Sequence, residues 1–261
     1  MANDFANGRL QPCALYTQEG SNIANAYDTS GNGNDLAFNF SGLGFDSSDY
    51  REGSQSRGPN ASGTLCASRS DVNLSAGFPG KGGGALGDLS IVTWAKWTSI
   101  TNYQHLIGKH YNTAGNAAGY GIYLNATGTP DRIVGFIPYG AGGDSAELFV
   151  DTGTSIVSGR WYHIAFTYEY SSKNWRIRIW DDTAQSVAET TGTGSQTAEC
   201  STRAFTIFNK EYWLGSEAFL GRLDGTAVFA GILTADEIDE IRAGIYGNDK
   251  KGPGLMMGCH F

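Results

Sequence analysis

From residue 90 onward the chain alternates short apolar runs with turn-forming residues, which is typical of β-strands joined by tight turns. In the run 175–180, the aromatic and aliphatic residues at 175, 177 and 179 fall on one strand face, with Arg176 and Arg178 on the other. The run 162–168 alternates similarly, and the polar segment 171–174 between them predicts an antiparallel hairpin. The predicted strands are 90–97, 104–109, 120–124, 132–138, 147–151, 162–168 and 175–181.

One segment near the C-terminus has the pattern of a helix. Thr234 can cap its start, and Glu237 follows three residues later as in a capping box. Ile238 and Ile241 then share one helical face, and Gly244 ends the segment. Many short strands with one short helix near the C-terminus predict an all-β fold, a sandwich of two antiparallel sheets.

The first ninety residues are rich in Gly, Ser and Asn but keep apolar residues at 36, 38, 40, 43 and 45. This mixture predicts loops and short strands that share the main core, and it argues against a linker or a separate N-terminal unit. A β-sandwich of this length is common as one unit. We therefore expect a single domain over residues 1–261.

Composition and charge narrow the possible partners. The chain has 37 Gly against 6 Pro, which indicates many tight turns, and its 18 basic and 26 acidic residues give a net charge of -8. That charge opposes binding to nucleic acid, and the absence of any run of roughly 18 apolar residues opposes membrane insertion. The start of the chain carries no signal-peptide pattern, so we expect a protein that reaches a virion or the extracellular space by release from the cell.

The four cysteines are too far apart for a zinc site. Cys13, Cys66, Cys200 and Cys259 are expected to be buried thiols, although an even number also permits two disulfides. Sequence alone does not give their pairing.

Four blocks, in order along most of the chain, resemble the laminin-G-like branch of the concanavalin A-like lectin and glucanase superfamily. The most specific is the last, a strand followed by a short helix. The blocks are 27–36 with an Asp-x-Ser-Gly-Asn-Gly opening, 89–97 with a central Trp, 159–168 with Trp-x-His, and 219–229 followed by 233–238.

This resemblance implies a jelly roll of two curved antiparallel sheets, with rim loops that in many relatives hold calcium and sugar. It does not choose an activity, because the same fold hosts lectins, glycosidases, lyases, adhesion domains and structural modules.

No catalytic set is evident in the sequence. Related glucanases carry two carboxylates on one strand face, and Glu237-Ile-Asp239 is the nearest match here. The helical signals of this segment place the two carboxylates on different faces, and Arg242 stands where the family has a second Glu. An enzymatic role is therefore not favoured.

A Gly-punctuated loop supplies oxygen ligands of the kind that calcium takes. We expect a calcium site formed by Asp28, Asn32, Asp35 and, if the first and last strands pair as in relatives, Asp224. The alternative is that these carboxylates bond the amides of an Asx-type turn, which requires the same residues.

Aromatic residues in the central strands and loops are candidates for sugar contact, since a ring offers an apolar face with a polar edge. The alternative is that these rings fill the core. The predicted ligand residues are Tyr103, Tyr111, Tyr120, Tyr139 and Trp213.

The sequence favours a non-catalytic structural or adhesive protein, such as a capsid decoration or tail-associated protein of a bacteriophage virion, with capacity to bind glycans. A homo-oligomer or a virion assembly would be its partner. One alternative is a secreted calcium-dependent carbohydrate-binding module, and a second is a polysaccharide hydrolase or lyase with an unrecognised site.

Overall fold

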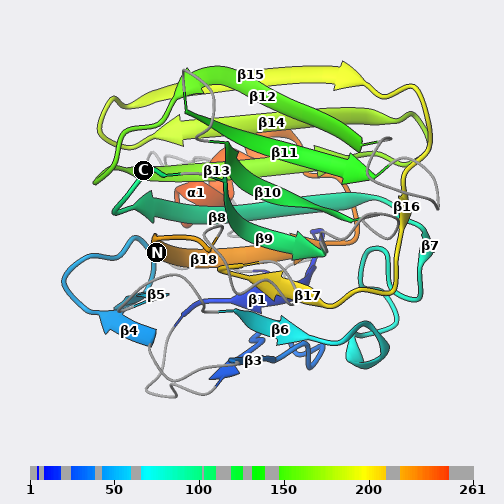
Figure 1. The fold of residues 1–261 in the computed structure, drawn as a ribbon, viewed down its shortest axis with the longest axis horizontal. Helices are drawn as coiled ribbons and strands as arrows, with labels where there is room; N and C mark the ends of the chain where they lie inside the picture. The colour runs from blue at the N-terminus through cyan, green and yellow to red at the C-terminus, as the bar shows by residue number, and fades with distance from the viewer. Residues whose placement is uncertain are drawn as a thin grey trace, which may run out of the picture.

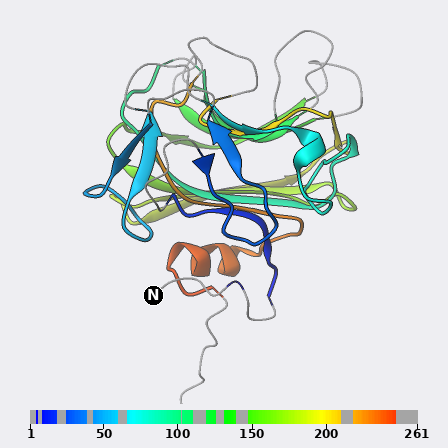
Figure 2. The same cartoon turned by 90° about the horizontal axis from the view of Figure 1, so that it is seen from below.

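The chain folds as two stacked antiparallel sheets (Figures 1 and 2) in a computed structural model. The structure describes residues 5, 9–18, 25–38, 43–59, 66–101, 103–109, 119–125, 131–138, 147–209 and 218–246. The predicted all-β sandwich with one short helix is thereby confirmed.

Sheet A contains eight strands in the order β15-β14-β13-β8-β18-β5-β4, with β1 also paired to β18. Its strands are β1 (Pro12–Tyr16), β4 (Leu43–Asp46), β5 (Ser56–Pro59), β8 (Leu89–Trp97), β13 (Trp161–Tyr168), β14 (Asn174–Asp181), β15 (Ser186–Thr193) and β18 (Gly221–Phe229).

Sheet B also contains eight strands, in the order β12-β11-β10-β9-β17-β6-β3-β2. They are β2 (Asn25–Ala26), β3 (Leu36–Phe38), β6 (Ala67–Arg69), β9 (Tyr103–Lys109), β10 (Tyr120–Asn125), β11 (Arg132–Pro138), β12 (Glu147–Ser155) and β17 (Phe205–Ile207). A small third sheet pairs β7 (Gly84–Ala85) with β16 (Glu199–Cys200), and a 3-10 turn, η1, covers Asp71–Asn73.

The strands predicted from alternation are confirmed, and their ends agree within one residue except that β12 continues to Ser155. The hairpin of β13 and β14 is also present. Its alternation works as expected, because Ile177 and Ile179 are buried between the sheets and Trp175 packs against the same cluster. The core is thus built from the inward positions of both sheets.

The first ninety residues contribute strands to both sheets. β1 pairs with β18, β4 and β5 extend sheet A, and β2, β3 and β6 extend sheet B. Lys109 of β9 secures the η1 turn, because its buried ammonium contacts Asp71 and donates to the Gly80 carbonyl at 2.7 Å. The segment therefore forms part of the sandwich, as its apolar residues predicted.

The helix α1 (Ala235–Arg242) lies against the face of sheet A that points away from sheet B (Figure 2). The expected capping box is present between Thr234 and Glu237, and Ile238 and Ile241 are both buried. They pack on Val92, Ala165, Ala227 and Phe229 from the three central strands of sheet A.

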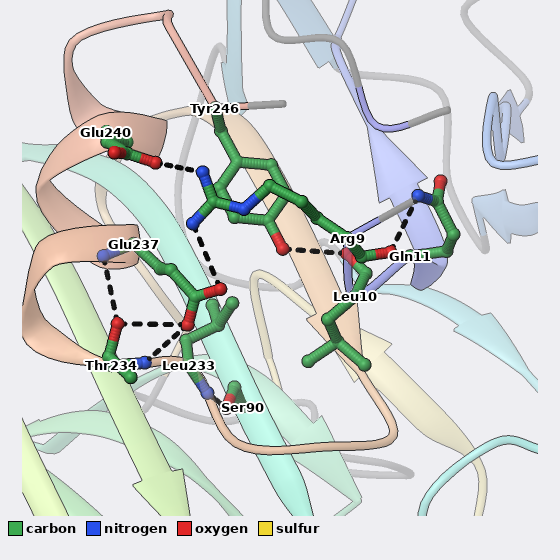
Figure 3. A network of polar contacts seen from close by, with 9 residues as sticks. All are labelled: Arg9, Leu10, Gln11, Ser90, Leu233, Thr234, Glu237, Glu240 and Tyr246. Atoms are coloured by element: carbon green, nitrogen blue, oxygen red, sulfur yellow. Dashed lines mark hydrogen bonds and ion pairs between the residues drawn. The ribbon is translucent and has the colours of Figure 1, made fainter. Parts of the chain in front are cut away.

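The N-terminal segment ties α1 to the sheet (Figure 3). Arg9 forms ion pairs with Glu237 and Glu240, and its guanidinium lies 4.3 Å from the centre of the Tyr246 ring. The Tyr246 hydroxyl in turn donates to the Leu10 carbonyl at 2.9 Å. Residues from both ends of the described chain thus cover this face of sheet A.

Three of the four cysteines confirm the expected buried thiols. Cys13, Cys66 and Cys200 are buried and free, and burial raises the pKa of Cys13 and Cys200 to about 12. Such thiols resist ionisation and therefore react slowly. Cys259 lies outside the described residues.

In the described part of the chain, no helix is both long and apolar enough to span a membrane.

Candidate ligand surface on sheet B

The outward positions of β9 to β12 carry aromatic rings. Inward neighbours such as Leu124 and Ile133 are fully buried in the core, so strand alternation directs the intervening side chains away from sheet A. We call this surface the aromatic face. Its members are Tyr103, His105, Tyr123, Val134, Phe136 and Phe149.

The strand register brings these rings together. Tyr123 of β10 lies opposite His105 of β9 and opposite Val134 of β11, and Phe136 lies opposite Phe149 of β12. Four strands therefore contribute to one continuous surface.

Ring contacts connect the whole face. The His105 and Tyr123 rings stack with centroids 5.5 Å apart, and Phe136 meets Tyr123 edge-on at 5.6 Å. Tyr103 and Phe149 join from the two sides, at 5.8 and 6.2 Å from Tyr123. These spacings are those of favourable aromatic pairs, so each ring holds its neighbours in place.

The face has a buried floor and an open margin. Phe136 and Tyr123 are 1% and 8% exposed, whereas Tyr103 and Phe149 are 37% and 53% exposed. An exposed ring supported by a rigid floor gives a ligand a preorganised apolar surface. At the β12 side, Asp151 pairs with Arg132 at 3.3 Å and adds polar groups beside the rings.

The structure locates two of the five predicted ligand residues. Tyr103 lies on the aromatic face. Tyr120 does not, because its side chain points into the core, is fully buried and donates from its hydroxyl to the Pro79 carbonyl at 3.1 Å. The expectation that Tyr120 contacts a ligand is therefore wrong. Tyr111, Tyr139 and Trp213 lie outside the described residues.

Sequence reasoning missed Phe136, Phe149 and His105 as members of the face. A signal was present in the spacing. Tyr103 and His105 are two residues apart and so lie on the same face of one strand, and Phe149 and Asp151 are spaced in the same way on another strand. Alternation shows which side chains share a face of one strand, but the pairing register between strands is also needed to show which of them are neighbours.

Asp28 organises the Gly-punctuated loop through backbone amides. Its Oδ1 accepts from the N–H groups of Leu15 and Ser30, both at 2.9 Å, and its Oδ2 accepts from Asn34 N–H at 2.8 Å. Asp35 accepts from Asp28 N–H at 2.7 Å, so two carboxylates fix this turn. The Asn32 amide donates to the Pro12 carbonyl at 3.2 Å.

Asp224 organises another loop by accepting hydrogen bonds from backbone amides. It is fully buried, and its Oδ2 accepts from the N–H groups of Arg51 and Glu52 at 2.7 and 2.8 Å. Its Oδ1 accepts from Gly225 N–H at 2.8 Å. Asp224 therefore holds the turn between β4 and β5.

These contacts fit the Asx-type alternative better than a calcium cage, since N–H donors occupy the carboxylate oxygens that a cation would need. Among the described residues, no group of three or more His, Cys, Asp or Glu side chains is arranged to hold a metal. Calcium binding by Asp28, Asn32, Asp35 and Asp224 stays a prediction.

The carboxylates of α1 have structural partners. Glu237 caps the helix and pairs with Arg9, and Asp239 pairs with Arg178 at 2.6 Å. Burial opposes ionisation of Glu237, but its hydrogen bonds with the Thr234 amide and Arg9 leave its pKa below the ordinary value. These contacts agree with the helical interpretation of this segment.

His163 is a buried residue of the covered face of sheet A. Its ring lies 5.0 Å from that of Trp94, and burial together with the Arg242 charge lowers its pKa to about 3. Its Nε2 has no hydrogen-bond partner among the described residues. The neutral ring is thus a packing element of the sheet.

A polar pocket of about 430 Å³ lies on sheet A, beside the segment leading to α1. Some of its polar groups already have partners, since Thr193 donates to Asn174 at 2.7 Å and Glu169 accepts from the Ser172 hydroxyl next to the pocket. The lining residues are Thr167, Glu169, Asn174, Trp175, Arg176, Thr191, Gly192, Thr193 and Ile232.

Three solved structures show how widely this fold recurs. An enzymatically active domain of tailspike protein 2 from bacteriophage CBA120 is 14% identical with a TM-score of 0.55, over 88% of this chain and 32% of that chain. Trypanosoma rangeli sialidase is 13% identical with a TM-score of 0.54, over 89% and 32%. An arabinofuranosidase is 17% identical with a TM-score of 0.51, over 86% and 50%.

The chain therefore spans about a third of the first two proteins and half of the third. At these identities the likeness shows the fold. No curated protein matches the sequence. The model of the concanavalin A-like lectin/glucanases superfamily matches residues 75–239, more than half of the chain, and the chain belongs to this family.

Proposed function

We propose that this chain is a glycan-binding protein whose ligand lies on the aromatic face of sheet B. The observation that carries this proposal is the cluster of outward rings on β9 to β12, with Tyr103 and Phe149 exposed above a buried floor. Isolated exposed apolar residues are normal. Tyr103 and Phe149 differ from these because both contact Tyr123 of the buried ring cluster, which supports a binding surface here.

The chemistry of the face suits a sugar. The C–H face of a pyranose packs on an aromatic ring, while its hydroxyl groups need polar partners such as Asp151 and Arg132 at the margin. An open surface of this kind binds in the micromolar to millimolar range, roughly -4 to -8 kcal/mol.

We further propose that the protein serves as an adhesive or structural component of a bacteriophage virion. Its likeness to part of a phage tailspike supports this role. Proteins named as a sialidase and an arabinofuranosidase share the fold, which supports a carbohydrate ligand. Its detection by mass spectrometry in purified particles of its phage would test the virion role.

A glycan array with the full chain tests the binding proposal. Wild type should bind a defined set of glycans, and Phe149→Ala and Tyr103→Ala should each lose at least tenfold in affinity, because the stacking surface is gone. The control is Val72→Ala, which removes an exposed apolar side chain (77% exposed) far from the rings in sequence. Equal binding by wild type and Phe149→Ala would overturn the proposal.

The same array separates the alternatives. Binding that disappears with a chelator, and in Asp28→Asn, would support the calcium-dependent module. Release of new reducing ends from a bound glycan would support the hydrolase alternative.

A further inference from the structure

The strand β15 forms an edge of sheet A with unusual regularity. All eight of its residues pair with β14 without a register shift, and it contains no Pro, Lys or Arg. Its exposed positions alternate along the strand, and Val187 is 40% exposed. Proteins usually protect long edges, because unpaired backbone groups recruit other strands.

The other edges of the two large sheets are protected. β2 and β4 have only two and four residues. β12 is long, but its register against β11 shifts and Gly153 adopts a left-handed φ of 73°. Among the described strands, β15 is therefore the long regular edge.

The backbone hydrogen bonds of β14 show which backbone groups of β15 point outward. Glu169 N–H donates to the Asn174 carbonyl, so the even positions of β14 face β13 and its odd positions face β15. Gly194 N–H donates to the Lys173 carbonyl, in agreement. The even residues of β15 are thus bonded to β14, and the outward N–H and C=O groups belong to Val187, Glu189, Thr191 and Thr193.

We propose that a second copy of this chain binds at β15, with the two strands antiparallel about a two-fold axis at Thr190. In this register Glu189 lies opposite Thr191 of the partner subunit and Val187 lies opposite the partner's Thr193. Each pair exchanges two backbone hydrogen bonds, since all four residues direct these groups outward.

Overlap and charge together favour this register for a second copy, because only two-fold axes at 189 and 190 pair seven residues of β15 with its copy, and charge favours the axis at 190. A shift of the axis to position 189 places two Glu189 carboxylates opposite each other, which is unfavourable. With the axis at Thr190 the carboxylate meets a hydroxyl, and it is already paired with Arg178 at 2.8 Å and with Arg176 at 3.5 Å. The edge is therefore self-complementary and nearly neutral.

The dimer has a consequence that rests on the proposed glycan function. A two-fold axis perpendicular to sheet A leaves both aromatic faces pointing to the same side. Two weak sites on one rigid body bind a multivalent surface with an avidity roughly 10²–10⁴ times that of one site.

Sedimentation velocity of the full chain, without glycan, tests the dimer independently of binding. At about 100 µM the mass obtained for the wild type should be twice the 27.8 kDa of one chain. Thr191→Pro should sediment as a monomer, because it removes an outward N–H that β14 does not use. Thr191→Val keeps that N–H and should remain dimeric. A monomeric wild type, or a dimeric Thr191→Pro, overturns the proposal.

A crosslink decides the register even if Thr191→Pro fails to fold. Two copies of position 190 meet as a non-hydrogen-bonded pair, whose Cα separation of about 4.5 Å suits a disulfide. Thr190→Cys should therefore give a covalent dimer on a non-reducing gel, well above wild type and the exposed control Thr183→Cys. A folded Thr190→Cys that does not crosslink above these controls overturns the proposal.

Discussion

The outer faces of the two sheets differ in the size of the side chains that strand alternation directs outward. On sheet A the outward residues of the central strands include the small side chains of Ala165 and Ala227. Ile238 and Ile241 of α1 pack against them. On sheet B the outward residues of β9 to β12 are large rings, and Phe149 stays 53% exposed. The chain itself covers the apolar face of sheet A with α1, whereas on the outer face of sheet B the rings of Tyr103 and Phe149 remain exposed.

The largest contrast is expected in stability. Ile238→Ala should lower the free energy of unfolding by about 3 kcal/mol, because it opens a cavity under the helix. Phe149→Ala should lower it by less than about 1 kcal/mol, because that ring is half in solvent. Urea unfolding midpoints measure both, and equal losses would remove the distinction between a covered and an open face.

The second effect is a dependence of stability on pH, which comes from His163 on the face of sheet A that α1 covers. His163 stays neutral when folded because burial and Arg242 lower its pKa to about 3, whereas in the unfolded chain it titrates near 6.5. As pH falls below about 6.5 only the unfolded state gains the proton, so stability is lost from there down to the folded pKa.

The contribution of this one group between pH 7.5 and 5.5 should be about 1.4 kcal/mol. It should disappear in His163→Phe, while His105→Phe on the aromatic face provides the matched control. Urea unfolding at the two pH values gives the difference, and an unchanged slope in His163→Phe would contradict a neutral buried ring.

A smaller effect is expected from the N-terminal tie. Arg9→Ala should cost about 0.5–1 kcal/mol, since its ion pairs with Glu237 and Glu240 are partly exposed and screened by solvent. A double-mutant cycle with Glu240→Ala measures the coupling. A coupling energy of zero would show that the Arg9–Glu240 ion pair does not stabilise the fold.

The smallest effect is on stability at acidic pH, and it comes from Glu237. The folded pKa of Glu237 lies below its ordinary value of 4.5, so its contribution is present above that value and is lost as pH falls through the folded pKa. Glu237→Gln should therefore show a shallower fall of the melting temperature below pH 4.5 than wild type. An identical fall in both proteins would contradict this contribution.

Local patterns predicted most of the fold. The alternation in β13 and β14 and the capping box at Thr234 each require only neighbouring residues, and both appear as expected. The short strands of the first ninety residues were not placed, because two to five residues carry too little alternation. Their position depends on distant partners, such as β18 for β1.

The candidate surface was only partly predictable. Tyr103 is exposed, as ligand contact requires, and its role stays a prediction. Tyr120 looks equivalent in sequence but points to the opposite face of the sheet and is buried. Phe149 and Tyr103 belong to one surface only through the register across four strands, and alternation within a single strand does not give that register. For Asp28 the residue types suited both a cation and a turn, and the amide partners became visible only in three dimensions.

The most direct test of the open aromatic face is an amide NMR titration of the full chain with a glycan found on the array. Chemical-shift changes should concentrate in 103–109, 119–125, 131–138 and 147–151, with α1 and the turn at Asp28 unchanged. Shifts centred instead on the sheet A pocket at Thr167 and Arg176, or on the loop 28–35, with the four strands unaffected, would contradict the account.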